Sequence, residues 1–115
     1  MADAAYYGWL GEFVKKVSPT NEGDPPAILI TALTAVGSLM GRAWFFEVDD
    51  KRHYPVLYSV FVGDTGISRK SAPVAVVKKQ TEIVDQEWTE RSYKVGLRTA
   101  EGLVNMLRDP PPRTR

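Results

Sequence analysis

The sequence contains no cysteine and only one histidine, His53. Without thiols the chain has no disulfide, no zinc–thiolate site and no cysteine nucleophile. A single histidine likewise excludes a histidine-rich metal site. These absences remove several large classes of metalloprotein and enzyme before any motif is considered.

The chain also lacks a long hydrophobic run and a strong net charge. Its longest apolar stretch, residues 25–41, is shorter than the roughly 20 residues that span a membrane, and it includes Thr31, Thr34 and Ser38. The N-terminus has no basic segment before an apolar one, unlike a secretion signal. A formal net charge of +1 neither demands nor excludes nucleic acid as a partner. We therefore expect a soluble, cytoplasmic protein.

The composition is that of a globular protein, because 43% of the 115 residues are hydrophobic and 25% are charged. This length suits one domain with a modest core. We expect a single domain over residues 1–109, with a helical segment at 6–41 and an α/β part at 43–109. Residues 110–115 are expected to form an irregular tail.

The spacing of apolar residues predicts four helices. Ser18, followed by a proline, ends the first. Asp24 caps the second with Pro25 at its first position, and Gly41 ends it. This second helix is apolar nearly all round, which predicts burial. Thr99 caps the last helix. The four ranges are 6–17, 25–41, 70–92 and 100–109.

Two segments rich in valine and aromatic residues predict strands at 43–48 and 55–63, joined by a polar turn at 49–54. They are expected to pair as a hairpin. Two strands alone would leave unpaired sheet edges, and strands from another copy would complete them, so we expect oligomerisation.

Other polar and aromatic residues each have a functional and a structural interpretation. His53 either contacts a nucleotide or DNA or lies exposed in a hairpin. The basic residues form one patch or are separately solvated. The tryptophans stack bases or pack in the core, and their apolar surroundings favour the core. Residues 47–50, with three carboxylates, fit a turn better than a metal site. The basic residues and the tryptophans concerned are Arg42, Lys51, Arg52, Arg69 and Lys70, and Trp9, Trp44 and Trp88.

Residues 61–77, FVGDTGISRKSAPVAVV, join a predicted strand to a predicted helix through a loop with two glycines. A phosphate-binding loop has this context, because backbone N–H groups and a helix N-terminus then face the phosphates. The usual pattern ends in Gly-Lys-Ser/Thr, but Arg69 stands before Lys70 and Ser71. The loop is therefore either a variant phosphate loop or a turn with a solvated Arg-Lys pair.

Several short motifs occur along the chain in a fixed order. They are GWLGE at 8–12, Glu22 with Asp24-Pro25 and Ala27, Gly41-Arg42, RHYPVL at 52–57, VGDT…RK at 62–70, and GLRTAEGL…RDP at 96–110. Together these motifs resemble the N-terminal half of a family of P-loop ATPase-like proteins from phages, prophages and other mobile elements, associated with helicases or primases.

The resemblance implies an α/β fold: N-terminal helices, then a small sheet with a P-loop-like strand–turn–helix, as an incomplete P-loop NTPase domain. It implies ATP and Mg²⁺ as cofactors. Lys70 would contact phosphate and Ser71 would hold magnesium, although many relatives have Gly-Thr where this chain has Ser71-Ala72. The implied cofactor-binding residues are Gly63, Asp64, Thr65, Gly66, Ile67, Ser68, Arg69, Lys70 and Ser71.

An ATPase also needs an acidic residue at a second strand end, and we find none. The later carboxylates, Glu82, Asp85, Glu87, Glu90 and Glu101, fall on predicted helices. We therefore expect the nucleotide-binding part of a mobile-element DNA replication ATPase, with no catalytic residues and no hydrolysis by this chain alone. The alternative is a DNA-binding or self-association module that keeps the fold without binding nucleotide. A second copy or a complementary ATPase half are the expected protein partners.

Overall fold

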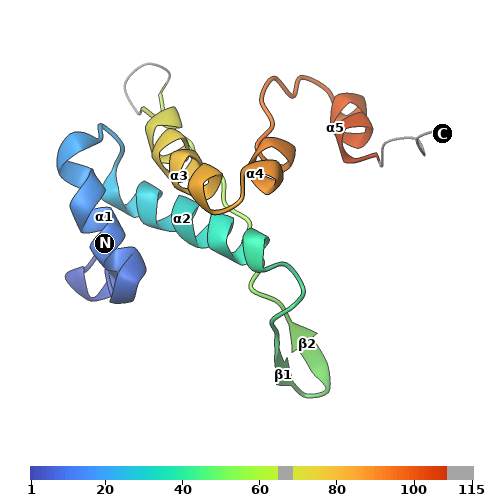
Figure 1. Ribbon diagram of the computed structural model, residues 1–115, viewed down its shortest axis with the longest axis horizontal. Helices are drawn as coiled ribbons and strands as arrows, with labels where there is room; N and C mark the ends of the chain where they lie inside the picture. Colours follow the sequence, from blue (N-terminus) through green and yellow to red (C-terminus); the bar gives the residue numbers. More distant parts are fainter. Residues whose placement is uncertain (65–68, 109–115) are drawn as a thin grey trace.

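The computed structural model describes residues 1–64 and 69–108, so the predicted tail at 110–115 lies outside it. The described part is 59% helical and has one antiparallel sheet of two strands (Figure 1). No helix within it has the length and apolar character needed to cross a bilayer. Its elements are the 3-10 helices η1 (Asp3–Ala5) and η2 (Ser18–Thr20), the helices α1 (Gly8–Val17), α2 (Pro25–Met40), α3 (Ser71–Val84), α4 (Gln86–Ser92) and α5 (Ala100–Leu107), and the strands β1 (Phe46–Val48) and β2 (Lys51–His53).

The core lies where α1 and α3 pack against α2 (Figure 1). Alanines on α2 face α3, and their small side chains let the two helices lie close together. The predicted burial of α2 is confirmed for one side only, because Leu33 and Met40 are both exposed. The buried residues form two clusters: Val14, Ile28 and Leu29, and Ala32, Ala35 and Val77.

The predicted ends of the first two helices are confirmed. The Ser18 hydroxyl donates to the Val14 carbonyl at 2.7 Å where α1 ends. Gly41 follows α2 with φ of +58°, a conformation that favours glycine. Asp24 holds the N-cap position of α2, but its side chain makes no capping hydrogen bond. Its backbone carbonyl accepts from the Ile28 N–H at 3.0 Å instead.

The predicted helix at 70–92 is two helices, α3 and α4, because the chain turns at Asp85. This residue is extended, with φ of −153°, and its carboxylate accepts from the Trp88 N–H at 2.8 Å. Aspartate competes well for such an N-cap. Ile83 and Val84, at the end of α3, are exposed. Thr99 caps α5 as predicted, accepting from the Gly102 N–H at 3.0 Å.

The predicted pairing of residues 43–48 with residues 55–63 is wrong, and a shorter hairpin forms instead. Asp49 and Asp50 have φ of +49° and +59°, and the strands pair on either side of them, Phe46 with His53 and Val48 with Lys51. A two-residue turn with both residues at positive φ matches the twist of paired strands. The second strand therefore lies inside the predicted polar turn, and residues 47–50 are a strand end and a turn.

Residues 55–63, predicted as the second strand, are not part of a sheet. They run as an extended segment with most apolar side chains exposed. Because β1 pairs with residues 51–53, the edge that residues 55–63 were expected to pair with is already occupied. Pro55 also lacks the N–H that a continuing ladder would need. The P-loop NTPase arrangement, in which this segment would be a sheet strand, stays a prediction.

Two of the three tryptophans are not in the core, contrary to the prediction. Trp9 and Trp44 are 66% and 67% exposed. Trp9 lies on the face of α1 that does not pack, whereas its neighbour Leu10 packs against the core, and Trp44 lies just before a hairpin that is open to solvent. Trp88, on α4, is half-buried.

Candidate functional site

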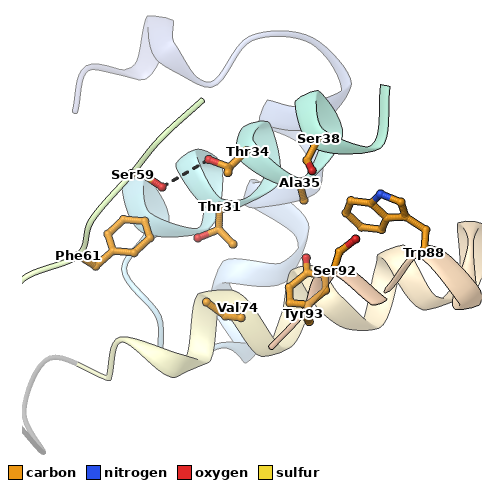
Figure 2. A pocket seen from close by; sticks show the side chains of 10 residues that line it. All are labelled: Thr31, Thr34, Ala35, Ser38, Ser59, Phe61, Val74, Trp88, Ser92 and Tyr93. Carbon is orange, nitrogen blue, oxygen red and sulfur yellow. Dashed lines mark hydrogen bonds between the residues drawn. The ribbon is translucent and has the colours of Figure 1, made fainter. Parts of the chain in front are cut away.

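The extended segment leads from the hairpin along α2 to the predicted phosphate loop. Glycine at position 37 of α2 allows this approach, because a side chain there would overlap the Pro55 carbonyl. Further along, the Ser59 and Thr34 hydroxyls lie 3.4 Å apart, and the Phe61 ring points toward α2 (Figure 2). The segment is thereby held against one face of α2 before it reaches Gly63.

Lys70 lies immediately before α3 and bonds back to the end of the extended segment. Its Nζ donates to the Gly63 carbonyl oxygen at 2.5 Å. The predicted binding residues Thr65–Ser68 lie outside the described residues, but the two sides of the loop are close together at Gly63 and Lys70. The ammonium and the N-terminus of α3 both contribute positive potential at this point.

Arg69 has a backbone conformation that glycine usually supplies. Its φ is +40°, in the left-handed region. Phosphate-loop patterns have glycine at this position, before the lysine. The chain therefore takes up the glycine-like conformation with an arginine present, at a cost of about 1 kcal/mol.

The Arg69 side chain is directed to a carboxylate from a distant part of the sequence. Its Nη1 lies 2.6 Å from Glu22 Oε1, in the loop before α2. Both side chains are more than half exposed, so the pair contributes little to stability. Its effect is to fix where the guanidinium lies, beside the loop and paired with an acid.

The loop before α2 packs against the start of α3. The Asn21 side-chain oxygen accepts from the Gly23 N–H at 2.7 Å, which folds this loop tightly. Gly23 faces the Pro73 ring so closely that an added methyl group would lie 2.8 Å from it. Asp24 and Lys70 line one small hollow of about 170 Å³ together with Phe61 and Pro73.

Sequence reasoning missed this acidic neighbourhood. The sequence pattern places Glu22 and Asp24 at a helix start, far along the chain from the loop. Both residues belong to the ordered motifs, which is the one feature of the sequence that marks them. Spacing along the chain does not reveal that their segment contacts the loop. The fold brings Glu22 and Asp24 to the same region as Arg69 and Lys70.

The later carboxylates have other surroundings. Glu82 pairs with Lys78 of the same helix at 3.7 Å, and Asp85 caps α4. Glu90 accepts from the Gln86 side chain at 3.0 Å. Glu87 and Glu101 lie in the first turns of α4 and α5, where a negative charge is favourable. Within the described ranges, no three acidic or histidine side chains are grouped as metal ligands would be.

The hairpin residues are separate from the loop. The hairpin projects from the C-terminal end of α2, while the start of α3 packs near its N-terminal end (Figure 1). His53 stacks on Phe46 with ring centroids 5.1 Å apart, and the Arg52 guanidinium lies 4.6 Å from the centre of the Phe45 ring. The basic residues of the hairpin therefore do not form one patch with Arg69.

A larger hollow of about 320 Å³ lies between α2, the extended segment and α4 (Figure 2). It is lined by hydroxyl-bearing residues of α2 and by Phe61, Trp88 and Tyr93. Partial burial raises the pKa of the Tyr93 hydroxyl above its ordinary value of 10.0, and an interaction with Thr81 acts in the opposite direction. Tyr93 is therefore neutral at physiological pH and presents a hydroxyl to this hollow.

The fold thus defines a mostly helical chain with a small hairpin and a charged loop at a helix N-terminus. No family model, curated protein or solved structure matches the chain.

Proposed function

We propose that the chain binds ATP with Mg²⁺ through the loop at residues 63–71, as the nucleotide-binding part of a mobile-element DNA replication ATPase. The observation that carries this proposal is the backbone of Arg69. Arg69 has a φ of +40°, a left-handed conformation that glycine adopts without strain, and glycine is the residue that the phosphate-loop pattern has before the lysine. The mismatch between Arg69 and the usual pattern therefore lies in the side chain and not in the backbone conformation.

The charges around Lys70 also support phosphate binding. Lys70 donates to the Gly63 carbonyl, and a phosphate oxygen is a stronger acceptor than this carbonyl. The lysine would exchange one contact for the other over a short movement. The N-terminus of α3 adds a partial positive charge, which also favours a bound phosphate.

Residues near Lys70 suit magnesium in their chemistry. Ser71 begins α3 and is exposed, and Asp24 shares a hollow with Lys70. Hydroxyl and carboxylate oxygens are ligands that Mg²⁺ accepts while it keeps several waters. Magnesium would neutralise phosphate charge there, and Ser71 is the proposed ligand. The proposal concerns binding, and we assign no hydrolysis to this chain.

Calorimetric titration with a non-hydrolysable ATP analogue and magnesium tests the proposal. Lys70→Ala should weaken binding at least about tenfold, which corresponds to ~1.4 kcal/mol. Lys79→Ala is the matched control, because it removes the same charge from an exposed position further along α3. A folded wild type that releases no heat, or equal affinities for the two variants, would show that the loop is structural.

A second function, self-association or DNA binding without nucleotide, is favoured by a different observation. The extended segment before the loop exposes Tyr58, Val60 and Val62 almost completely. This surface suits a protein partner better than DNA, because residues 55–63 carry no positive charge. DNA binding predicts an affinity that falls steeply with salt, whereas association through apolar residues does not.

A further inference from the structure

The extended segment runs along α2 (Figure 1), and within the described part of the chain no strand lies next to it in a sheet. Within the described part of the chain, no backbone N–H or carbonyl group of residues 57–62 makes a hydrogen bond. A row of free donors and acceptors is a template for another strand. Pairing these groups with another strand exchanges hydrogen bonds to solvent for hydrogen bonds between strands.

The side chains of this segment alternate between two faces. Ser59 and Phe61 face α2, as Figure 2 shows. Tyr58, Val60 and Val62, which alternate with them, are 95%, 87% and 92% exposed. A nearly continuous apolar run of this kind is typical of a strand that is buried on both faces, and in the isolated chain only one face of this segment is covered.

We propose that residues 57–62 pair with the same segment of a second copy of this chain, as an antiparallel two-stranded ribbon centred on Val60. The pairing is reciprocal, as in other two-fold interfaces. It joins the unbonded edge of one copy to the unbonded edge of the other. It does not depend on nucleotide binding.

The side-chain pairs of this register are compatible with a second copy. Tyr58 lies opposite Val62, and Val60 lies opposite its own equivalent. Pairs of aromatic and β-branched residues stabilise antiparallel strands. Because residues 55–63 contain no charged residue, two copies meet without repulsion between like charges. The low net charge of +1 also opposes association only weakly.

The other extended segment, residues 93–98, is less suited to this role. It carries Lys94 and Arg98, so two copies would bring like charges together. Gly96, with φ of +77°, interrupts its extended backbone. Val95 is nevertheless 90% exposed, which makes it a matched control for Val60.

Sedimentation equilibrium over a range of protein concentrations tests the proposal. The wild type should approach twice its monomer mass of 12.8 kDa. Val60→Pro removes one backbone donor from an exposed position and should raise the dimer dissociation constant at least tenfold. Val95→Pro and Lys70→Ala should leave it unchanged. A wild type that stays monomeric, or that forms species of unlimited size, would overturn the proposal.

Cross-linking tests the register. The chain has no cysteine, so Val60→Cys introduces a single thiol. Directly opposed residues of an antiparallel pair lie within disulfide reach, at about 4.5 to 5.5 Å between Cα atoms. Under mild oxidation Val60→Cys should form a covalent dimer, and Val95→Cys should not. Equal yields from the two variants would contradict an interface centred on Val60.

Discussion

Arg69 is held in an unusual backbone conformation while its side chain pairs with Glu22. Glu22→Gln should lower the free energy of unfolding by less than about 1 kcal/mol, because the pair is exposed. The same change should strengthen binding of the ATP analogue by up to about fivefold, since it removes a negative charge near Lys70. Urea denaturation and calorimetry measure the two effects.

Glu12→Gln is the control for this prediction, because it removes the same charge from an exposed position on α1. It should change neither quantity. A double-mutant cycle with Arg69→Gln isolates the energy of the pair itself. Weaker analogue binding by Glu22→Gln would mean that the carboxylate helps to position the loop and does not compete with phosphate.

Tyr93 makes stability depend on pH in the alkaline range. Its pKa is raised in the folded state, so the folded chain holds this proton more tightly than the unfolded chain does. The stability it contributes is complete well below pH 10 and decreases as the pH rises through 10 toward the folded pKa. Tyr93→Phe should therefore lose stability less steeply above pH 10.

Urea unfolding at pH 8 to 11 measures this dependence. Tyr7→Phe is the control, because Tyr7 is 88% exposed, and its profile should match that of the wild type. If Tyr93→Phe follows the wild-type curve through pH 11, the hydroxyl is not buried as the structure has it.

Asp85 separates α3 from α4, and one side-chain hydrogen bond defines the boundary. Asp85→Ala removes the acceptor for the Trp88 N–H and should cost about 1 kcal/mol. Asp85→Asn keeps an acceptor oxygen and should cost much less. Circular dichroism with urea denaturation compares the two variants. If Asp85→Ala were as stable as Asp85→Asn, the packing of α4 would set the boundary and the cap would not.

The helices were largely predictable from the sequence because their signals are local. Gly41 and Thr99 act within a few residues of the ends that they define. The strands were not predictable in the same way, because strand pairing depends on which segments of the chain come together in the fold. The hairpin turns at Asp49 and Asp50, several residues before residue 55. Residues 55–63 therefore have a strand-like sequence without a strand partner.

The same distinction holds for the candidate site. The position of Lys70 at the start of a helix followed from local pattern. The contact of Glu22 with Arg69 and the shared hollow of Asp24 and Lys70 depend on how α2 packs against α3. No spacing in the sequence encodes that packing directly.

Stability should be distributed unevenly over the molecule. The buried clusters join α1, α2 and α3, whereas α5 contains no buried residue and lies apart from them (Figure 1). Amide hydrogens exchange through local opening where few apolar contacts hold an element. We expect the amides around Ile28 and Ala32 to be the most protected and those of α5 to exchange fastest among the helices.

Hydrogen exchange followed by mass spectrometry or NMR measures this order. The exchange of α2 should require opening of the whole core, so a core change such as Val77→Ala should accelerate it. The same substitution should leave α5 unaffected, because nothing in the core clusters comes from that helix. Protection of α5 equal to that of α2 would show that α5 is bound to the rest of the molecule, and the core would then extend beyond the three helices that define it here.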